Sequence, residues 1–167
     1  MSTITVTETV HAPIERVFAI ASNIPEAAST VEGIGLIETL KEAEPAENNN
    51  GVVGLGYAWR ETRIMFGKKA TEDMSITSWS PPALYTVEAR SHGCHYLTDI
   101  TFESLPEQSG NPVTAMTMTF NATPETLGAK VMMKIFAFMT KKLVQCLADD
   151  LRDIKTAAEA EWVKINT

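Results

Sequence analysis

The stretch from residue 125 to residue 162 constrains the fold most, because its spacing predicts one helix of about ten turns. In its second half the apolar side chains fall on one stripe, opposite charged ones. The stripe consists of Leu143, Leu147, Leu151, Ile154 and Ala158. In the first half, residues 131–139 are apolar on nearly all sides apart from lysines. Such a helix is expected to cover something apolar at its start, either a ligand cavity or a second protein.

The 167 residues, 44% of them hydrophobic, predict a single domain over residues 1–167. The formal net charge is −7 and the sequence pI is about 5.0. This balance argues against binding to nucleic acid and to anionic membrane surfaces, because both favour clustered Lys and Arg.

The cysteines and the amino terminus indicate where the protein is expected to work. Cys94 and Cys146 lie far apart in sequence, and without a signal peptide they are interpreted as free thiols in a reducing compartment. No apolar run reaches the roughly 18 residues that a membrane span needs. The expectation is therefore a cytoplasmic protein without stable membrane insertion.

The order of elements predicts an α+β fold with an antiparallel sheet. Ile4, Val6 and Val10 alternate with threonines as in a half-buried strand, and Pro13 then starts a short helix. A second short helix, a strand and a polar loop follow, and five more strands precede the long helix. The predicted ranges are 26–30 for the second helix, 34–40 for the strand, 41–50 for the loop and 51–121 for the five strands.

Two stretches carry a family resemblance. Residues 10–18, which include an A-P-x-E-R-V-F motif, and residues 147–158 resemble the START-related (SRPBCC) superfamily. Residues 56–63 resemble the third strand of its bacterial polyketide cyclase/dehydrase branch, and the superfamily also includes lipid-transport and pollen-allergen-like proteins. The resemblance implies a helix-grip fold, in which a curved antiparallel sheet of about seven strands wraps around a long carboxy-terminal helix. It implies an internal cavity but no fixed catalytic set.

The alternation of side chains along each strand predicts which residues line that cavity. The more apolar faces are rich in methionine and aromatic residues, which suit an irregular apolar guest. The expected ligand-binding residues are Tyr57, Trp59, Glu61, Arg63, Met74, Tyr85, Tyr96, Thr98, Ile100, Met116, Met118, Met132, Met133 and Phe136.

Glu61 is the candidate catalytic residue, since a carboxylate facing an apolar cavity has its pKa raised unless it is paired, for example with Arg63. Such a group can act as a general acid or base. By strand alternation Glu72 faces the same side as Glu61. It is the weaker candidate, because its strand can also be interpreted as extending into solvent at this position or as shifted by a bulge.

No metal or cofactor is expected. His92, Cys94 and His95 lie together in an apparent hairpin turn, but the sequence offers no second ligand cluster with zinc spacing. The turn is interpreted as a surface feature near the cavity mouth.

Three functions remain open at this point. The first is binding of a small hydrophobic or amphipathic molecule by a carrier, sensor or sequestering protein. The second is an enzyme of the cyclase, dehydratase or hydrolase type that uses Glu61. The third is a protein-interaction module that engages a partner through the apolar first half of the long helix. The chain is expected to be a monomer or a homodimer.

Overall fold

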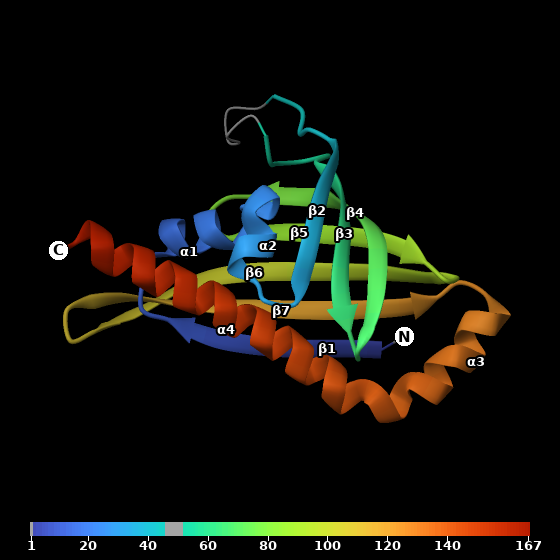
Figure 1. The fold of residues 1–167 in the computed structure, drawn as a ribbon. Helices are drawn as coiled ribbons and strands as arrows, with labels where there is room; N and C mark the ends of the chain where they lie inside the picture. Colours follow the sequence, from blue (N-terminus) through green and yellow to red (C-terminus); the bar gives the residue numbers. More distant parts are fainter. Residues whose placement is uncertain (1, 46–51) are drawn as a thin grey trace.

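The computed structural model describes residues 2–45 and 52–167, without the side chains of Ile135, Phe136 and Phe138. Part of the predicted polar loop, residues 46–50, lies outside the described residues. Seven strands form one antiparallel sheet in the order β1-β7-β6-β5-β4-β3-β2 (Figure 1). Their bounds are Ser2–Val10 (β1), Ile34–Lys41 (β2), Ala58–Met65 (β3), Lys68–Ser80 (β4), Leu84–Ser91 (β5), Cys94–Gln108 (β6) and Asn111–Pro124 (β7).

In the described residues the helices lie between β1 and β2 and after β7. The first connection contains α1 (Ile14–Ala21), the short 3-10 helix η1 (Ile24–Glu26) and α2 (Ala27–Thr30). The chain ends with α3 (Leu127–Phe136), η2 (Ala137–Met139) and α4 (Thr140–Ile165). The predicted α+β helix-grip architecture, with two short helices after the first strand, is confirmed (Figure 1).

The terminal helix is not one straight rod, and in this respect the sequence-based prediction is wrong. The three residues of η2 interrupt it, and α3 turns away from the line of α4 (Figure 1). The direction of α3 is set where it leaves β7, with Thr126 accepting a hydrogen bond from the amide of Ala129 as a helix cap. The direction of α4 is set by burial of Leu147 and Leu151. One straight helix cannot meet both constraints, so the chain bends between them.

The core fills the space between the second half of α4 and the middle of the sheet. Leu151, Ile154 and Ala158 belong to one buried cluster with residues of α1 and of strands β5 to β7. Phe18 lies at its centre, with its ring 5.3 Å from that of Phe102 in an edge-to-face contact. The buried Thr114 hydroxyl donates to a backbone carbonyl at 2.8 Å, so that polar group costs little.

Candidate functional site

The register places the sequence-predicted strand residues on one face of the sheet. Residues directly opposite each other in neighbouring strands share a face. One row of such partners runs from Trp59 to Met74 and across β5 to Tyr96. A second row joins Tyr85 to Ile100 and then to Met118. Since Tyr85 and Ile100 share a buried cluster with α4, this is the face that the helix covers.

Burial along this face is uneven. Near the second half of α4, Tyr85, Ile100 and Met116 are fully buried. Towards the other end, Tyr96, Thr98 and other predicted ligand-binding residues are only half-buried. The half-buried set also includes Met74, Met118 and the inward-facing Val87 and Phe120. An apolar surface that stays partly accessible on the concave side of a sheet is available to a ligand.

The side chains expected from the terminal helix are less enclosed than those of the strands. Met132 is 48% exposed, and Met133 is half-buried. The side chain of Phe136 lies outside the described part of the structure. The bend at η2 accounts for the exposure of Met132, because α3 does not continue the line along which α4 packs on the sheet (Figure 1).

Tyr57 and Trp59 form part of a second buried cluster with Ile24 and Ile76. Their rings stack at 5.7 Å, and the Tyr57 hydroxyl lies 2.9 Å from the hydroxyl of Thr39. Both side chains are almost completely buried, at 0% and 2% exposure. Tyr57 and Trp59 therefore form a buried aromatic layer next to Glu61 on β3.

Three charged side chains meet where β3 faces α4. Arg63 donates from Nη2 to both carboxylate oxygens of Asp150, at 2.8 and 2.9 Å. Arg63 Nε lies 3.7 Å from Glu61 Oε1, and the Trp59 indole donates to Glu61 Oε2 at 3.5 Å. The side chains of Glu61, Arg63 and Asp150 are 9%, 13% and 13% exposed. Two carboxylates share one guanidinium, so the cluster carries one uncompensated negative charge when both acids are ionised.

Burial determines the protonation of this cluster. It raises the pKa of Glu61, and the nearby Arg63 cation reverses only part of the effect. Burial also raises the pKa of Asp150, although Arg63 Nη2 donates to both of its carboxylate oxygens. For Arg63, burial acts to lower the pKa, but the two carboxylates outweigh it and leave that pKa above its ordinary value. The guanidinium therefore stays charged, and Glu61 takes up a proton more readily than an exposed glutamate.

Two tyrosines on the same face keep their protons at neutral pH. Burial raises the pKa of Tyr96 to about 12, helped by a hydrogen bond with Cys94. Burial also raises the pKa of Tyr85, whose hydroxyl donates to the carbonyl of Ala21 at 2.8 Å. Of these two, Tyr96 is the half-buried one and can offer its hydroxyl to a ligand.

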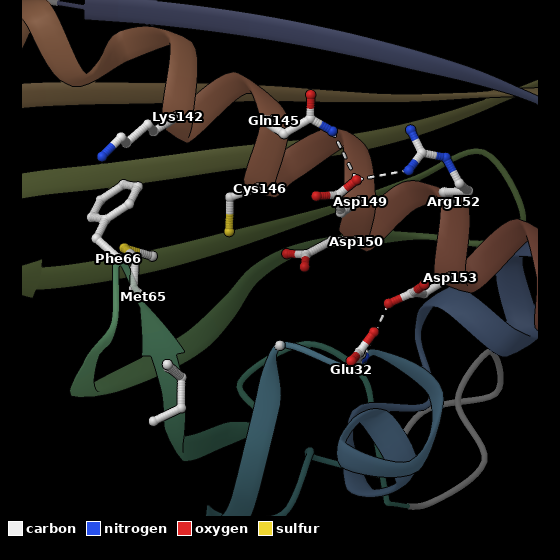
Figure 2. A pocket seen from close by; sticks show the side chains of 12 residues that line it. Glu32, Met65, Phe66, Lys142, Gln145, Cys146, Asp149, Asp150, Arg152 and Asp153 are labelled. Carbon is white, nitrogen blue, oxygen red and sulfur yellow. Dashed lines mark hydrogen bonds and ion pairs between the residues drawn. The ribbon is translucent and has the colours of Figure 1, made fainter.

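A groove of about 700 Å³ opens beside the charged cluster, between α4 and the turn that joins β3 to β4 (Figure 2). Asp150 and Cys146 line its wall from α4, and burial raises the pKa of the Cys146 thiol. Met65 and Phe66 face them from the β3–β4 turn. The groove thus gives the charged cluster an outlet to solvent at the edge of the sheet.

Sequence reasoning had not selected Asp150 or Cys146. Asp150 lies between the stripe positions Leu147 and Leu151, on the border of the buried face. A carboxylate at this border can reach a partner below the helix, and in the structure that partner is Arg63.

Glu72 and the His92–His95 turn do not join this cluster. The Glu72 carboxylate lies 3.9 Å from Nδ1 of the exposed His92. His95 Nε2 lies 2.9 Å from Glu88, and Cys94 is buried. Within residues 2–45 and 52–167, no three His, Cys, Asp or Glu side chains are grouped to hold a metal ion.

The fold and the concave, partly apolar face define a START-type helix-grip protein. The chain belongs to the family described as polyketide cyclase/dehydrase and lipid transport, whose profile matches residues 1–158. No helix in the described part of the chain is long and apolar enough to cross a membrane.

Solved structures show the same fold at low sequence identity. The ZhuI aromatase/cyclase of Streptomyces sp. R1128 is 14% identical with a TM-score of 0.69, over 95% of this chain and 93% of that one. A protein from Thermus thermophilus is 16% identical with a TM-score of 0.67, over 96% and 99%. A START superfamily protein from Mycobacterium smegmatis is 12% identical with a TM-score of 0.56, over 91% and 98%. A comparison with curated protein sequences gave no match.

Proposed function

We propose that this protein binds a small hydrophobic or amphipathic molecule between the concave face of the sheet and helices α3 and α4. The observation that carries the proposal is the half-buried apolar surface around Met74, Tyr96 and Met118, next to a buried charged cluster. Apolar side chains that stay partly exposed on a concave face lack part of the stabilisation that full burial gives. A ligand that covers them supplies that stabilisation on binding. The family and the fold support the same function.

The charged cluster gives the ligand a preferred orientation. Arg63 Nε is buried, and no hydrogen-bond partner for it is found in the described part of the chain. An unsatisfied buried donor is costly, so a ligand oxygen that reaches it gains affinity. A protonated Glu61 can donate to the same oxygen. The ligand that fits best has an apolar body along β5 to β7 and a carbonyl, hydroxyl or carboxylate directed towards β3.

The first test is native mass spectrometry of freshly purified protein, which should reveal a co-purifying small molecule. The second uses the fluorescent probe 1-anilinonaphthalene-8-sulfonate, which combines apolar rings with an anionic group. Met118→Trp fills the concave side and should weaken probe binding at least about tenfold, equivalent to about 1.4 kcal/mol. Thr117→Trp changes the neighbouring residue on the opposite face and should leave the affinity nearly unchanged. Equal affinities for the two variants would contradict the proposal.

A second candidate function is catalysis on the bound molecule, favoured by the position of Glu61 beside Arg63 in a buried site. Glu61 would serve as general acid or base, and Arg63 would stabilise negative charge on oxygen. Glu61→Gln preserves the shape of the side chain but cannot transfer a proton. A carrier with this change keeps most of its probe affinity, whereas an enzyme keeps the affinity and no longer converts the co-purified molecule.

A further inference from the structure

Basic residues are concentrated at one end of the molecule. Between residues 126 and 148 the chain has four lysines and no acidic residue, although acidic residues outnumber basic ones by seven overall. The β3–β4 turn adds two more lysines, again without an acid between residues 64 and 69. All six side chains are exposed, and in the part of the chain that the structure describes none of them forms an ion pair. The six are Lys68, Lys69, Lys130, Lys134, Lys141 and Lys142.

Large apolar side chains are exposed among these lysines. On α3, Leu127 is 80% exposed and Val131 is 61% exposed. They lie one helical turn apart, and so do Lys130 and Lys134 beside them. Ala129 is buried on the opposite side, so α3 attaches by one face and presents an apolar and basic face to solvent. Ile64 and Phe66 at the β3–β4 turn are 61% and 43% exposed.

The two groups of residues lie at the same end of α4. Phe66 of the β3–β4 turn and Lys142 of α4 line the same groove (Figure 2). The helix α3 continues from this end of α4 through η2 (Figure 1). We call this surface, made of α3, the first turn of α4 and residues 64–69 around the β3–β4 turn, the basic end. Helix α3 follows the end of β7, close to where the half-buried Tyr96 pairs with Ala122.

We propose that the basic end docks reversibly on an anionic phospholipid bilayer. Exposed aliphatic residues flanked by lysines are the composition that places an amphipathic helix in the interface of such a bilayer. Lysine stems cover apolar surface while their amino groups reach the lipid phosphates. A stable protein partner is a poorer match, because protein interfaces favour arginine and disfavour lysine, and all six basic residues here are lysines.

The acidic remainder of the chain orients this contact. On α4 the lysines end at Lys142 and the acids begin at Asp149, roughly 10 Å further along the helix. An anionic surface attracts the lysines and repels the acidic residues, so only the basic end can approach it. The net charge of −7, taken alone, argues against binding to anionic membrane surfaces. The net charge averages over the whole chain, in which the lysines of the basic end are separated from the acidic residues.

The test is flotation of the full-length protein with vesicles of phosphatidylcholine, alone or with about one third phosphatidylserine. Binding should require phosphatidylserine and should be lost near 1 M salt, where the screening length falls to about 3 Å. Lys130→Glu with Lys134→Glu should reduce the partition coefficient at least about 20-fold, because each lysine near an anionic surface contributes about fivefold. The control, Lys41→Glu with Lys164→Glu, makes the same charge change at exposed positions outside the basic end and should change it less than about twofold.

A second pair of variants tests the apolar contribution. Leu127→Ser with Val131→Ser should weaken vesicle binding, whereas Val163→Ser with Ile165→Ser, at residues 58% and 54% exposed, should not. Circular dichroism verifies that all variants fold. Binding that ignores phosphatidylserine, or equal effects of the two lysine pairs, overturns the proposal. A third outcome would also overturn the proposal: the protein does not bind vesicles and forms a dimer, and Lys130→Glu with Lys134→Glu dissociates that dimer. This outcome would assign the basic end to contact with a second copy of the chain. Vesicle binding needs no ligand, so this result is independent of the probe measurements above.

Discussion

Removal of the Arg63 guanidinium tests the buried cluster directly. In Arg63→Met the side chain keeps much of its length, but Glu61 and Asp150 lose their shared cation while remaining buried. Breaking a buried ion pair costs about 3–5 kcal/mol, because the remaining charge is left without a partner. The two carboxyls can relieve part of this cost by binding protons, so we expect a loss of about 3 kcal/mol in the free energy of unfolding at pH 8.

The dependence on pH follows from the direction of the pKa shifts. Burial already raises the pKa values of Glu61 and Asp150 above their ordinary values of 4.5 and 3.8, and loss of the cation raises them further. The folded variant then binds more protons than the unfolded chain. Its stability falls as the pH rises through the folded-state pKa values. The loss of unfolding free energy in Arg63→Met, relative to the unmutated protein, should therefore be largest at pH 8 and smaller near pH 5.

The assay is urea unfolding followed by tryptophan fluorescence at both pH values. Arg60→Met is the matched control, because Arg60 is on the same strand but forms an exposed ion pair with Asp73, with side chains 45% and 54% exposed. Exposed pairs contribute little to stability, so this variant should remain close to the unmutated protein. If Arg63→Met were no less stable than Arg60→Met, or if its deficit did not change with pH, the account of the cluster would be refuted.

Three further substitutions test other contacts by urea unfolding. Leu147→Ala removes a residue that is 7% exposed on the sheet-facing side of α4 and should cost about 2–5 kcal/mol; less than about 0.5 kcal/mol would mean that this helix face carries no core contact. Gly93→Ala should lower the free energy of unfolding by about 1–3 kcal/mol, since the φ of Gly93 is +74° and a Cβ there would lie 2.4 Å from Thr126 Oγ1. Its control, Gly110→Ala, has a φ of +78° with open space around it and should lower the free energy of unfolding less. Thr114→Val should cost about 1–2 kcal/mol, because a buried carbonyl loses its donor; an unchanged midpoint would contradict that reason.

The faces of the strands could be predicted from sequence because side-chain alternation survives wherever the register is unbroken. Pairing between β3 and β4 is continuous from Ala58 to Met65, so the parity that placed Glu61 and Met74 inward applies throughout. Between Ile76 and Ser78 a register shift interrupts the alternation. Strict alternation from Ile76 would direct Trp79 outward, yet Trp79 packs against the core. A bulge of this kind depends on the neighbouring strand and leaves no mark in the local sequence.

The terminal helix illustrates what the sequence could not provide. Its two halves were distinguishable by their apolar patterns, but a helical pattern does not give the direction in which each half is held. That direction comes from contacts distant in sequence, such as the hydrogen bond from the amide of Glu125 to the carbonyl of Gly93 at the start of α3. The ion pair between Arg63 and Asp150, 87 residues apart, likewise exists only after α4 has been placed on the sheet.

Stability alone does not account for three charged side chains at this position. A buried ionic cluster replaced as a whole by apolar residues of similar volume is often equally or more stable, whereas loss of one member is costly. Glu61 and Asp150 together outnumber the single positive charge of Arg63, which makes the cluster less favourable than a simple pair. The ligand proposed above would change this balance. Its oxygen would accept from Arg63 Nε, which has no hydrogen-bond partner in the described part of the chain, and its apolar body would cover the half-buried strand residues. In the complex proposed above, the cost of the cluster in the free protein would become a source of affinity and orientation.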